Sequence, residues 1–562
     1  MIFFCSIGPK LAREIPESSK SFSEYLKDPV KNAFKFDYIT QQNIYATLSK
    51  LKSKSSVGKD GISMKMLKEI MPAIIKPVTY LFNLSLSTGY IPTEYKCAKI
   101  IPVFKANKAD RFDNYRPISI LPALSKLLEK IVAIQMINFL ENNNVLYCHQ
   151  YGFRKGRDTQ QPLIHFLNRI YEGINKPISE YTLSIFIDLR KAFDTCDFNV
   201  LLEKLKHYGF RNTTWFKNYV TGRSQYVSIN GVNSKEKQIT VGVPQGSVLG
   251  PILFLIYIND LPNASKFFSS LFADDTLLST SGHDLNEMKN FANVELEKCS
   301  DWFKANKLSL NAAKTKFMMF RSDRMQTVNS NFKLYIDGTE IERIGSNCQN
   351  KSFKFVGIHL DELLNWDQHI NNVNSKLSSA NYALNQVKKI LPCKILKTIY
   401  MTMMEPHIQY SNITWGLSNS KSKNSILLKQ KKAVRSIAGA NYNSHTDPLF
   451  AKLKLLKFDD LVEMNVCQFI FKFLRNQLPD TFSSMFKPLN SVRTNKLLVE
   501  IPKIKYLESF PRVFYPKTWN AQQISIRRSN SVREMKSLMK KSALTRYNSF
   551  RCNKTKCYPC KK

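Results

Sequence analysis

The sequence lacks the features that mark a membrane or secreted protein. None of its 562 residues fall in a window offering the roughly 18 uninterrupted apolar residues that a spanning helix needs. The opening residues, MIFFCSIGPK, do not have the charged and then apolar layout of a signal peptide. We therefore expect a soluble, intracellular protein of the nucleus or the cytoplasm, which is not secreted and has no membrane partner.

Cysteine is sparse, and most cysteines stand alone in the sequence. Most of the 11 lie singly within apolar segments, as Cys97 and Cys196 do. This spacing favours reduced core thiols over a disulfide framework. A cluster occurs only in the terminal run RCNKTKCYPC, at Cys552, Cys557 and Cys560. Because a closed structural zinc site takes four ligands, we favour a frayed basic tail over a zinc site there.

Acidic residues are also scarce. The chain has 44 Asp and Glu against 83 Lys and Arg, which gives a formal net charge of +39. Such an excess predicts a polyanionic partner, either nucleic acid or an anionic membrane surface. The last stretch, 501–562, is especially basic, since Glu508 and Glu534 are its only acids. We expect the strongest non-specific attraction at that end.

The distribution of apolar residues predicts four regions. The length suggests about three or four structural units. Residues 86–360 alternate short β-type runs with amphipathic helices, which indicates a mixed α+β domain. Before it, 1–85 form a helical N-terminal extension, interrupted by the loop KSKSSVGKDGI. After it, helical periodicity predominates in 361–480, and 481–562 form a basic C-terminal tail.

Two adjacent aspartates stand inside an apolar run of this basic chain. In SSLFADDTLLST, the runs SLF and TLLS flank ADD. This arrangement predicts a hairpin with Asp274 and Asp275 at its tip. Aspartate is a common turn residue, and for this segment taken alone that explanation would be favoured.

A third aspartate changes that balance. The apolar run Leu183 to Ile187 predicts a buried strand that ends on Asp188, before a helix that begins near Lys191. An aspartate at the rim of a core must be paired, cap a helix or bind a metal. Capping does not explain the other two acids, because three adjacent carboxylates repel one another unless divalent cations neutralise them. We therefore predict a magnesium-type site, of the kind that phosphoryl transfer uses as a pair of ions.

Eight segments together resemble a known family. SIFIDLRKAFD, GVPQGSVLGPILFLIYINDLP, LFADDT, LSLNAAKTKFMMF and FKFVGIHLD stand in the order of the palm motifs of reverse transcriptases. SSVGKDGI, IIPVFKANKADRFDNYRPISI and QYGFRKGRDT resemble that family's fingers motifs. The sequence is most similar to enzymes of non-long-terminal-repeat (LINE-type) retrotransposons of the jockey-like kind. The resemblance implies a right-hand polymerase of the α+β class. The fingers would start within 1–85. Fingers and a palm with an antiparallel sheet and helices would occupy 86–360, followed by a helical thumb-like region at 361–480 and the basic C-terminal tail at 481–562.

The resemblance also implies an activity. It predicts an RNA-directed DNA polymerase that extends a DNA primer on an RNA template by two-metal nucleotidyl transfer during retrotransposition. The expected partners are an RNA template, a DNA primer and target, and deoxynucleoside triphosphates, with Mg²⁺ as cofactor and Mn²⁺ as the alternative. A truncated, non-catalytic nucleic-acid-binding remnant is the competing hypothesis, and the intact motifs favour the polymerase.

Elements of this kind usually encode an endonuclease domain upstream of the polymerase. Nothing before residue 58 has the length of such a domain. We therefore expect the chain to lack the endonuclease and Met1 to mark a truncated reading frame.

The family's motifs assign roles to the acids and to one lysine. Asp188, Asp274 and Asp275 match the catalytic, metal-binding carboxylates, and the backbone carbonyl of Leu189 is a further candidate ligand. Lys314 in NAAKTK matches the lysine proposed to protonate the leaving pyrophosphate. A lysine beside a nucleic-acid groove could equally contact a phosphate.

Five other residues are predicted to form the nucleotide pocket. Phe193 matches the steric gate that would exclude a 2′-hydroxyl, and simple core packing is the alternative. In VPQGS, Gln245 offers amide hydrogen bonds and Gly246 permits close backbone approach to a nucleotide. Lys105 and Arg116 match fingers cations that clasp the triphosphate, one as a point charge and the other as a bidentate fork.

Further cations are candidates for nucleic-acid binding. Arg154 and Arg157 lie in the fingers-like motif GFRKGRD. In LLKQKKAVRSIAGA, a basic face lies opposite an apolar face that contains Ala433, Val434 and Ile437. The basic face comprises Lys429, Lys432 and Arg435. For most of the 83 cations, a solvated surface remains the ordinary expectation.

Overall fold

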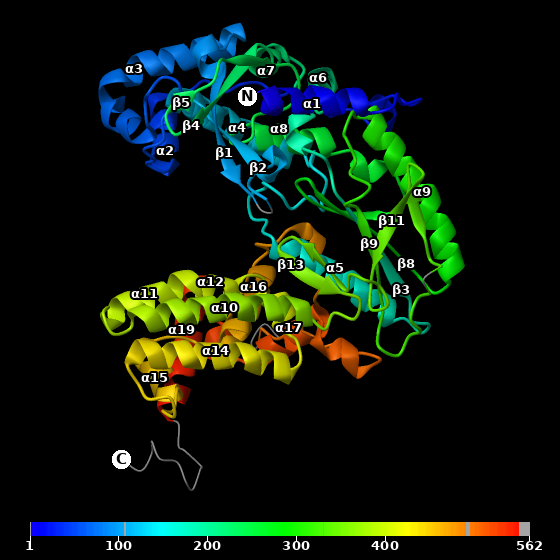
Figure 1. Cartoon of the computed structure of the whole chain (residues 1–562), viewed down its shortest axis with the longest axis vertical. Helices are drawn as coiled ribbons and strands as arrows, with labels where there is room; N and C mark the ends of the chain where they lie inside the picture. The colour runs from blue at the N-terminus through cyan, green and yellow to red at the C-terminus, as the bar shows by residue number, and fades with distance from the viewer. Residues whose placement is uncertain (1, 106–107, 330, 490–494, 550–562) are drawn as a thin grey trace.

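The chain forms a C-shaped molecule whose two arms are joined by a sheet. The structure, a computed structural model, describes residues 2–105, 108–329, 331–489 and 495–549. Figure 1 shows an N-terminal lobe at the top, a C-terminal helical region at the bottom and a six-stranded sheet between them. Cys552, Cys557 and Cys560, and with them the zinc question, lie outside the described residues.

The N-terminal lobe surrounds a small sheet with helices. The helices are α1 (Ile2–Glu14), α2 (Gln41–Lys50), α3 (Met64–Thr88), α4 (Ala123–Asn142), α6 (Phe198–His207) and α7 (Thr214–Val220). The strands run in the order β2-β1-β4-β5, with β6 also paired to β4. They are β1 (Cys97–Phe104), β2 (Tyr115–Ile120), β4 (Arg223–Ile229), β5 (Val232–Asn233) and β6 (Lys237–Ile239). The predicted helices and the loop between α2 and α3 are present, whereas 15–40 are helical only at the 3₁₀ turn Phe22–Tyr25.

Helix α3 shows how local chemistry sets the boundaries here. The Ser63 hydroxyl accepts a hydrogen bond from the Met66 backbone N–H at 3.1 Å and caps the first turn. Gly89 ends the helix in the left-handed conformation, with φ of 75°, where a side chain would be strained.

The six-stranded sheet has the order β10-β11-β9-β3-β8-β7. Its strands are β3 (Tyr181–Ile187), β7 (Phe268–Phe272), β8 (Asp275–Gly282), β9 (Lys316–Phe320), β10 (Leu334–Ile336) and β11 (Thr339–Ile344). Every residue of β3 is buried, because alternate side chains enter two different cores. Leu183, Ile185 and Ile187 join the core shared with the N-terminal lobe, whereas Phe186 joins the core of the C-terminal region.

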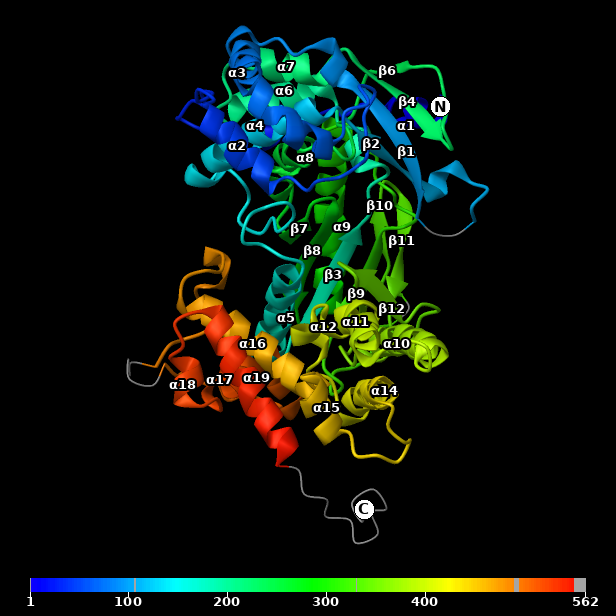
Figure 2. The same cartoon turned by 90° about the vertical axis from the view of Figure 1, so that its left-hand side faces the viewer.

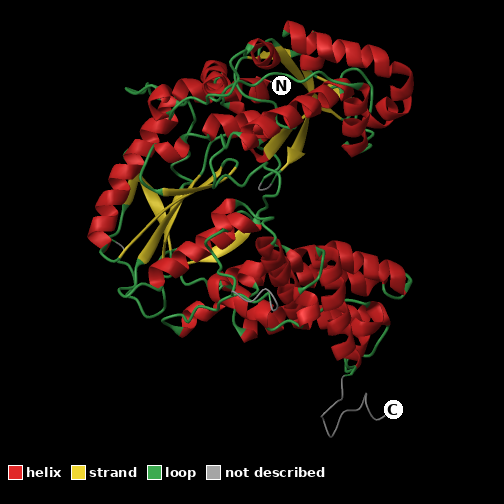
Figure 3. Ribbon diagram, turned by 180° about the vertical axis from the view of Figure 1, so that it is seen from behind, coloured by secondary structure: helices red, strands yellow, loops and turns green. Residues whose placement is uncertain are grey.

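Helices cover both faces of this sheet. On the first face, α8 (Gly250–Ile258) and α9 (Leu285–Ala305) contribute to the core shared with the N-terminal lobe. On the other face, α5 (Gln160–Ile174) packs against β3 and β7 and belongs to the C-terminal core. Figure 3, seen from behind, shows these strands between the two helical arms.

One predicted boundary is wrong. The helix expected near Lys191 is instead a short 3₁₀ turn, Ala192–Asp194, because Lys191 adopts a left-handed φ of 50°. The α-helix begins later, at Phe198. Its cap is Asp197, whose carboxylate accepts the backbone N–H groups of Asn199 at 2.9 Å and Val200 at 3.1 Å.

The C-terminal region is helical, as the sequence predicts. A two-stranded hairpin, β12 (Ser352–Phe355) and β13 (Ile358–Asp361), leads into it, and within the described residues no further strand follows. Its helices are α10 (Asp367–Val387), α11 (Cys393–Met403), α12 (Glu405–Gln409), α13 (Asn412–Trp415), α14 (Ser420–Ala438), α15 (Asp447–Leu453) and α16 (Phe458–Leu474). The apolar face predicted on α14 is confirmed, since Ala433, Val434 and Ile437 are buried. No helix in the described part of the chain is long and apolar enough to cross a membrane.

The segment expected to be a basic tail is folded over most of its length. Residues 495–549 include α17 (Pro511–Asn520), α18 (Ile524–Arg527) and α19 (Val532–Asn548). Figure 2 shows these helices packed among α15 and α16. Tyr515 and Trp519 are fully buried in the C-terminal core. The sequence shows no clear sign of this core, because its buried apolar residues stand singly in a segment that is rich in Lys and Arg.

The end of the chain also returns to the central sheet. Helix α17 packs against α5. The Arg512 guanidinium donates to Glu500 at 2.9 Å, and the Tyr171 hydroxyl of α5 donates to the same carboxylate at 3.2 Å. The last helices are therefore part of the layer that supports the sheet.

Replacing Trp519 with Ala tests this packing. The indole is buried and donates a hydrogen bond to the Asn495 carbonyl at 2.6 Å. We expect the free energy of unfolding to fall by about 3 to 5 kcal/mol, the usual loss for a large aromatic core residue. A denaturant titration measures it, with Lys517→Ala, an exposed position on the same helix, as the control. If 495–549 were an unfolded tail, both substitutions would change the free energy of unfolding by the same small amount.

Candidate active site

Asp188 stands at the end of the central strand β3. Its carboxylate accepts a hydrogen bond from the Asn311 side-chain amide at 2.8 Å. Its backbone N–H donates to the Thr315 hydroxyl at 3.3 Å, and its carbonyl accepts from the Asn311 N–H at 2.9 Å. The turn before β9 therefore fixes both the main chain and the side chain of Asp188. Sequence reasoning did not find Asn311, although it lies in the quoted motif LSLNAAKTKF.

The β7–β8 hairpin carries the other two aspartates to the same place. Ile187 of β3 pairs with Thr276 of β8, so the next residues along, Asp188 and Asp275, face each other at the sheet edge. Phe272 pairs with Asp275, which leaves Ala273 and Asp274 as the two-residue turn. The predicted hairpin is confirmed, with the refinement that Asp275 is the first residue of β8.

A buried glutamine holds this turn. The Gln150 side-chain oxygen accepts the Ala273 N–H at 3.0 Å and the Gly152 N–H at 2.9 Å, and Gln150 is only 2% exposed. Ala273 adopts a left-handed φ of 58°, which costs energy for a residue with a side chain. A Cβ on Gly152 would lie 2.4 Å from the Ala273 nitrogen, so this approach requires glycine. Gln150 and Gly152 therefore position Asp274, and only their place in the motif QYGFRKGRDT gave any signal in the sequence.

The three carboxylates act on one another. Partial removal from water, and then repulsion from Asp274 and Asp188, raise the pKa of Asp275 to about 6. Partial removal from water and repulsion from Asp188 also raise the pKa of Asp274. Lys105 and Arg116 oppose both shifts, which places these two cations close to the acids.

The three predicted cations of the site belong to neighbouring elements. Lys105 follows β1, Arg116 lies on β2 and Lys314 precedes β9. Partial burial, and then repulsion from Arg116 and Lys314, lower the pKa of Lys105. Arg116, Lys314 and Asp188 thus each lie near enough to Lys105 to act on it electrostatically.

Phe193 lies at the rim of the core. Its half-buried ring stacks on Phe254 of α8, with centroids 4.6 Å apart and an interplanar angle of 22°, and meets the exposed Phe153 edge-on at 6.4 Å. One side of the ring therefore packs in the core. Both predicted roles, steric gate and core packing, remain open on this geometry.

Gln245 has a partner that the sequence did not indicate. Its side-chain amide donates to the Asp194 carboxylate at 2.9 Å. Burial raises the pKa of Asp194 to about 6. Since Asp194 follows Phe193 directly, this bond ties the VPQGS turn to the predicted nucleotide pocket.

Gly246 is required by packing inside the protein. Its φ is 108°, and a Cβ there would lie 2.8 Å from the Ser119 carbonyl oxygen of β2. The Gln245 carbonyl accepts the Ser119 N–H at 2.7 Å. The close backbone approach predicted for Gly246 is therefore made to β2, and its contact with a nucleotide stays a prediction.

Leu189 stays a candidate ligand through its carbonyl. It forms an isolated antiparallel bridge with Leu310. The two bonds beside this bridge run from Arg190 N–H to the Ser309 carbonyl and from Asn311 N–H to the Asp188 carbonyl. Neither bond uses the Leu189 oxygen.

The structure argues against Arg154 as a phosphate contact. Its side chain is 6% exposed and donates to Glu141 at 2.8 Å and to the Tyr147 carbonyl at 2.8 Å. We assign it a structural role, because a buried and paired guanidinium is not free to meet a backbone phosphate. Arg157 is partly exposed, donates to the Cys148 carbonyl and lies over the Tyr151 ring.

The cations of α14 lie away from the acids, in the C-terminal region (Figure 1). Lys432 is exposed, and Lys429 and Arg435 are half-buried. The Arg435 guanidinium donates to the Ser444 carbonyl at 3.0 Å. These three residues stay predictions as nucleic-acid contacts.

The chemistry of the acids fits a hard divalent cation. Carboxylate and carbonyl oxygens are the donors that Mg²⁺ takes, and the mutual repulsion of the three carboxylates is relieved by positive charge. Within the described residues, no three His, Cys, Asp or Glu side chains converge closely enough to hold an ion alone. Mg²⁺ is usually bound by one or two carboxylates together with water and substrate phosphates, so this geometry agrees with a site that substrate completes.

Comparison with known families gives the identity of the domain that carries these acids. Residues 105–360 match the family described as reverse transcriptase (RNA-dependent DNA polymerase). These residues are a reverse transcriptase domain. The matched stretch runs from Lys105 to Leu360 in β13, and it contains all three aspartates.

Curated relatives extend the similarity beyond this reverse transcriptase domain. The chain is 26% identical over 472 residues to the RNA-directed DNA polymerase from mobile element jockey of Drosophila melanogaster, covering 81% of this chain and 50% of that protein. It is 28% identical over 462 residues to the RNA-directed DNA polymerase from mobile element jockey of Drosophila funebris. That alignment covers 80% of this chain and 49% of the relative. The chain is 28% identical over 424 residues to the probable RNA-directed DNA polymerase from transposon X-element of Drosophila melanogaster. That alignment covers 72% of this chain and 44% of the relative. The chain spans about half the length of these relatives.

The raised pKa of Asp275 gives the reverse transcriptase domain a testable pH dependence. Because the folded-state pKa of about 6 lies above the usual carboxyl value, the folded state binds more protons between these two values. The contribution of Asp275 to the stability of the protein should therefore fall as pH rises from about 4 to 6. We expect Asp275→Asn to raise the melting temperature at pH 8 and to have little effect below pH 4.

Melting curves across this pH range measure the effect, with Asp37→Asn, an exposed aspartate of the N-terminal lobe, as the matched control. Mg²⁺ at pH 8 should stabilise the parent more than Asp275→Asn. A variant whose melting temperature follows that of the parent at every pH would contradict the electrostatic coupling.

Proposed function

We propose that the protein is an RNA-directed DNA polymerase that extends a DNA primer on an RNA template, as part of retrotransposition. One observation carries the proposal. The register of β3 with β8 sets Asp188 beside Asp275, next to the turn that bears Asp274. In a chain of net charge +39, such a concentration of acid serves cation binding, while the surrounding cations serve a polyanionic substrate.

The arrangement of the chain suits a right-hand polymerase. In this proposal the N-terminal lobe forms the fingers, the six-stranded sheet with α5, α8 and α9 forms the palm, and α10 to α16 form the thumb. Helices α17 to α19 support the thumb and the palm from below, since α17 packs on both α5 and α16. The duplex would lie between palm and thumb, within reach of Lys429, Lys432 and Arg435.

Asp188, Asp274 and Asp275, with the Leu189 carbonyl as a further ligand, would hold Mg²⁺ or Mn²⁺. When bound, such ions activate the attacking oxygen and stabilise the leaving one in phosphoryl transfer. The chain keeps these ligands in place through two amides: Asn311 bonds to Asp188, and Gln150 bonds to the turn of Asp274.

The remaining residues bind and orient the nucleotide. Lys105 and Arg116 bind its triphosphate by charge and by bidentate hydrogen bonds. Gln245, oriented by Asp194, lies against the incoming base, and Phe193 excludes the 2′-hydroxyl. Lys314 donates a proton to the leaving pyrophosphate. The proposed partners are therefore an RNA template, a DNA primer and target, and deoxynucleotides, in the nucleus or the cytoplasm.

Replacing Asp274 with Asn tests the acid cluster. The change keeps the size and turn preference of the residue but removes a ligand charge. We expect primer extension on RNA to fall by more than about 100-fold, because even the groups that hydrogen-bond to a metal's ligands contribute about 10- to 100-fold. The melting temperature should not fall below the parent value, because the change removes a carboxylate whose charge is disfavoured there. The affinity for the primer–template should stay near the parent value. Extension is measured with purified protein, RNA template, DNA primer, Mg²⁺ and deoxynucleotides.

The matched control for this experiment is again Asp37→Asn, which should extend at the parent rate. Parental extension by Asp274→Asn would remove the residue from the catalytic site. A parent that binds the primer–template but never extends it would favour the competing hypothesis of a non-catalytic remnant.

Replacing Phe193 with Val tests the choice of sugar. If the ring occupies the space that a ribose 2′-hydroxyl needs, its loss should raise kcat/KM for ribonucleotides by about 10-fold or more. Deoxynucleotide use should change less, because the ring excludes by overlap. Steady-state kinetics with matched ribo- and deoxynucleotides measure the ratio.

The stack of Phe193 on Phe254 makes a stability measurement necessary alongside the kinetics. Phe254→Leu is the control, since it disturbs the same stack without opening the predicted gate. Equal kinetic losses with both sugars, together with destabilisation by about 3 to 5 kcal/mol, would assign Phe193 to the core alone.

A further inference from the structure

A buried glutamate of α4 lies behind the turn that carries Gln245. Glu129 is 2% exposed, and one of its carboxylate oxygens accepts the backbone N–H groups of Val248 at 2.7 Å and of Leu249 at 3.4 Å. Leu249 is the N-cap of α8, and the first N–H groups of a helix have no partners within it. The bonds to Glu129 therefore attach the start of α8 to α4.

The turn that leads into α8 is held from several sides. Within it, the Ser247 hydroxyl donates to the Pro244 carbonyl at 2.9 Å and accepts the Gly250 N–H at 2.9 Å. From β2, the Ser119 N–H donates to the Gln245 carbonyl. The carboxylate of α4 adds a third attachment, so the turn has little freedom to move.

Two parts of the predicted nucleotide pocket depend on where this turn lies. Gln245, which bonds to Asp194, is three residues before Val248. Phe254 is buried in the middle of α8 and supports the ring of Phe193 through their stack. A shift of the start of α8 would therefore move the predicted base contact and the predicted sugar gate together.

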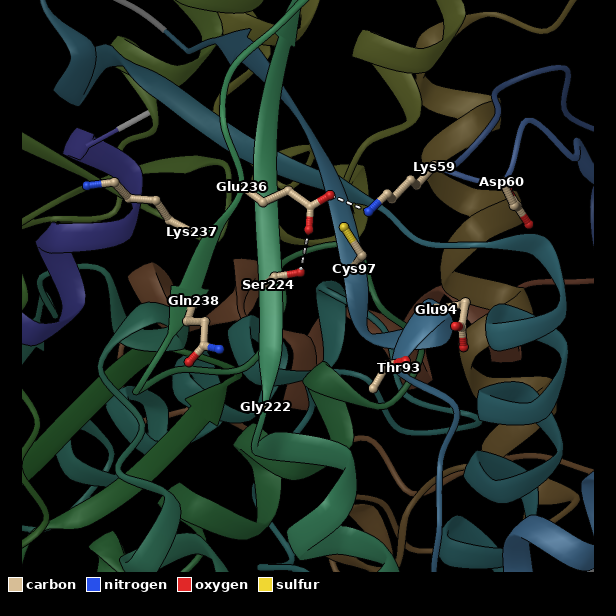
Figure 4. A pocket seen from close by; sticks show the side chains of 10 residues that line it. All are labelled: Lys59, Asp60, Thr93, Glu94, Cys97, Gly222, Ser224, Glu236, Lys237 and Gln238. Atoms are coloured by element: carbon tan, nitrogen blue, oxygen red, sulfur yellow. Dashed lines mark hydrogen bonds and ion pairs between the residues drawn. The ribbon is translucent and has the colours of Figure 1, made fainter.

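Arg223 places an opposite charge near this carboxylate. It is the first residue of β4, is 1% exposed and donates to the Tyr219 carbonyl at 3.0 Å. Burial raises the pKa of Glu129, and the attraction of Arg223 opposes that shift. The residues on either side of Arg223, Gly222 and Ser224, line a cavity of about 530 Å³ (Figure 4), whereas Arg223 does not. Its charge therefore acts inside the lobe, where it partly compensates Glu129.

We propose, on the basis of the polymerase function proposed above, that Glu129 is a positioning residue of the nucleotide pocket. Its bonds to the start of α8 set Gln245 and Phe193 against the incoming deoxynucleotide. Glu129 does not touch the nucleotide itself, because its carboxylate is buried and bonds to the main chain. A glutamate has the reach for this task from α4, and one of its oxygens serves two N–H groups at once.

The test separates the reach of this side chain from its charge. Glu129→Asp keeps a carboxylate near Arg223 but retracts it by one methylene from the N–H groups. Glu129→Gln keeps the reach, since an amide oxygen can accept both N–H groups, and removes the carboxylate. Glu295→Asp is the matched control, because Glu295 of α9 is 3% exposed and accepts the Lys266 N–H at 2.7 Å in the loop before β7. Neither Glu295 nor Lys266 lines the small cavity beside Gln245.

Kinetics and binding are both measured, at a temperature at which melting curves show every variant to be folded. Steady-state kinetics with RNA template, DNA primer and Mg²⁺ give kcat and KM for matched deoxy- and ribonucleotides. A primer that ends in a dideoxynucleotide gives the affinity for the next nucleotide without chemistry.

For Glu129→Asp, we expect kcat/KM for deoxynucleotides to fall by about 10- to 100-fold, since a misplacement of about 1 Å can cost about 100-fold. The loss should lie mainly in a raised KM and a weaker affinity for the next nucleotide, and the preference for deoxynucleotides over ribonucleotides should narrow. Glu129→Gln and Glu295→Asp should give values near those of the parent, and no variant should change the affinity for the primer–template.

Parental constants for Glu129→Asp would overturn the proposal. Equal losses for Glu129→Gln, or for Glu295→Asp, would also overturn it, because the reach of Glu129 would then not be what positions the pocket. Failure of the polymerase proposal is seen separately. A parent that binds the next nucleotide on the blocked primer but extends no primer would discard the polymerase, and the affinities of the variants would still decide the role of Glu129. A parent that binds no nucleotide would overturn both.

Discussion

The repulsion among Asp188, Asp274 and Asp275 is the constraint on which the site depends. The pairing of β3 with β8 brings these carboxylates together. Partial removal from water, and then repulsion from Asp274 and Asp188, raise the pKa of Asp275. Much of the surrounding structure holds them there: Asn311 bonds to the first, and Gln150 to the turn of the second. In a chain of net charge +39, we propose that this cluster brings a cation and an anionic substrate together.

The central sheet ties this site to both arms of the molecule. Side chains on one face of β3 join the core of the N-terminal lobe, and Phe186 joins the C-terminal core. Helix α5 lies between the sheet and α17, so the last described helices buttress the layer that carries the acids. The C-terminal region therefore supports the sheet that carries the acids, in addition to contributing positive charge.

Sequence reasoning predicted the elements whose signal is local. The buried strand ending on Asp188, the β7–β8 hairpin and the apolar face of α14 follow from alternation, turn residues and helical spacing, and all three are confirmed. Sequence reasoning missed the contacts that join residues far apart in the chain. The bonds from Gln150 to Ala273 and from Asn311 to Asp188 each join residues more than a hundred positions apart. The fold of 495–549 was missed because its aromatic core residues are scattered among cations.

The central claim is that the three carboxylates jointly bind divalent ions once substrate is present. Anomalous scattering from Mn²⁺ in crystals of the protein with primer, RNA template and a non-reactive nucleotide tests this claim directly. The account predicts Mn²⁺ peaks at about 2.0 to 2.6 Å from carboxylate oxygens of Asp188 and of the Asp274–Asp275 turn, the range for oxygen ligands of divalent ions. Peaks only elsewhere in the molecule, with these carboxylates unbound, would contradict it.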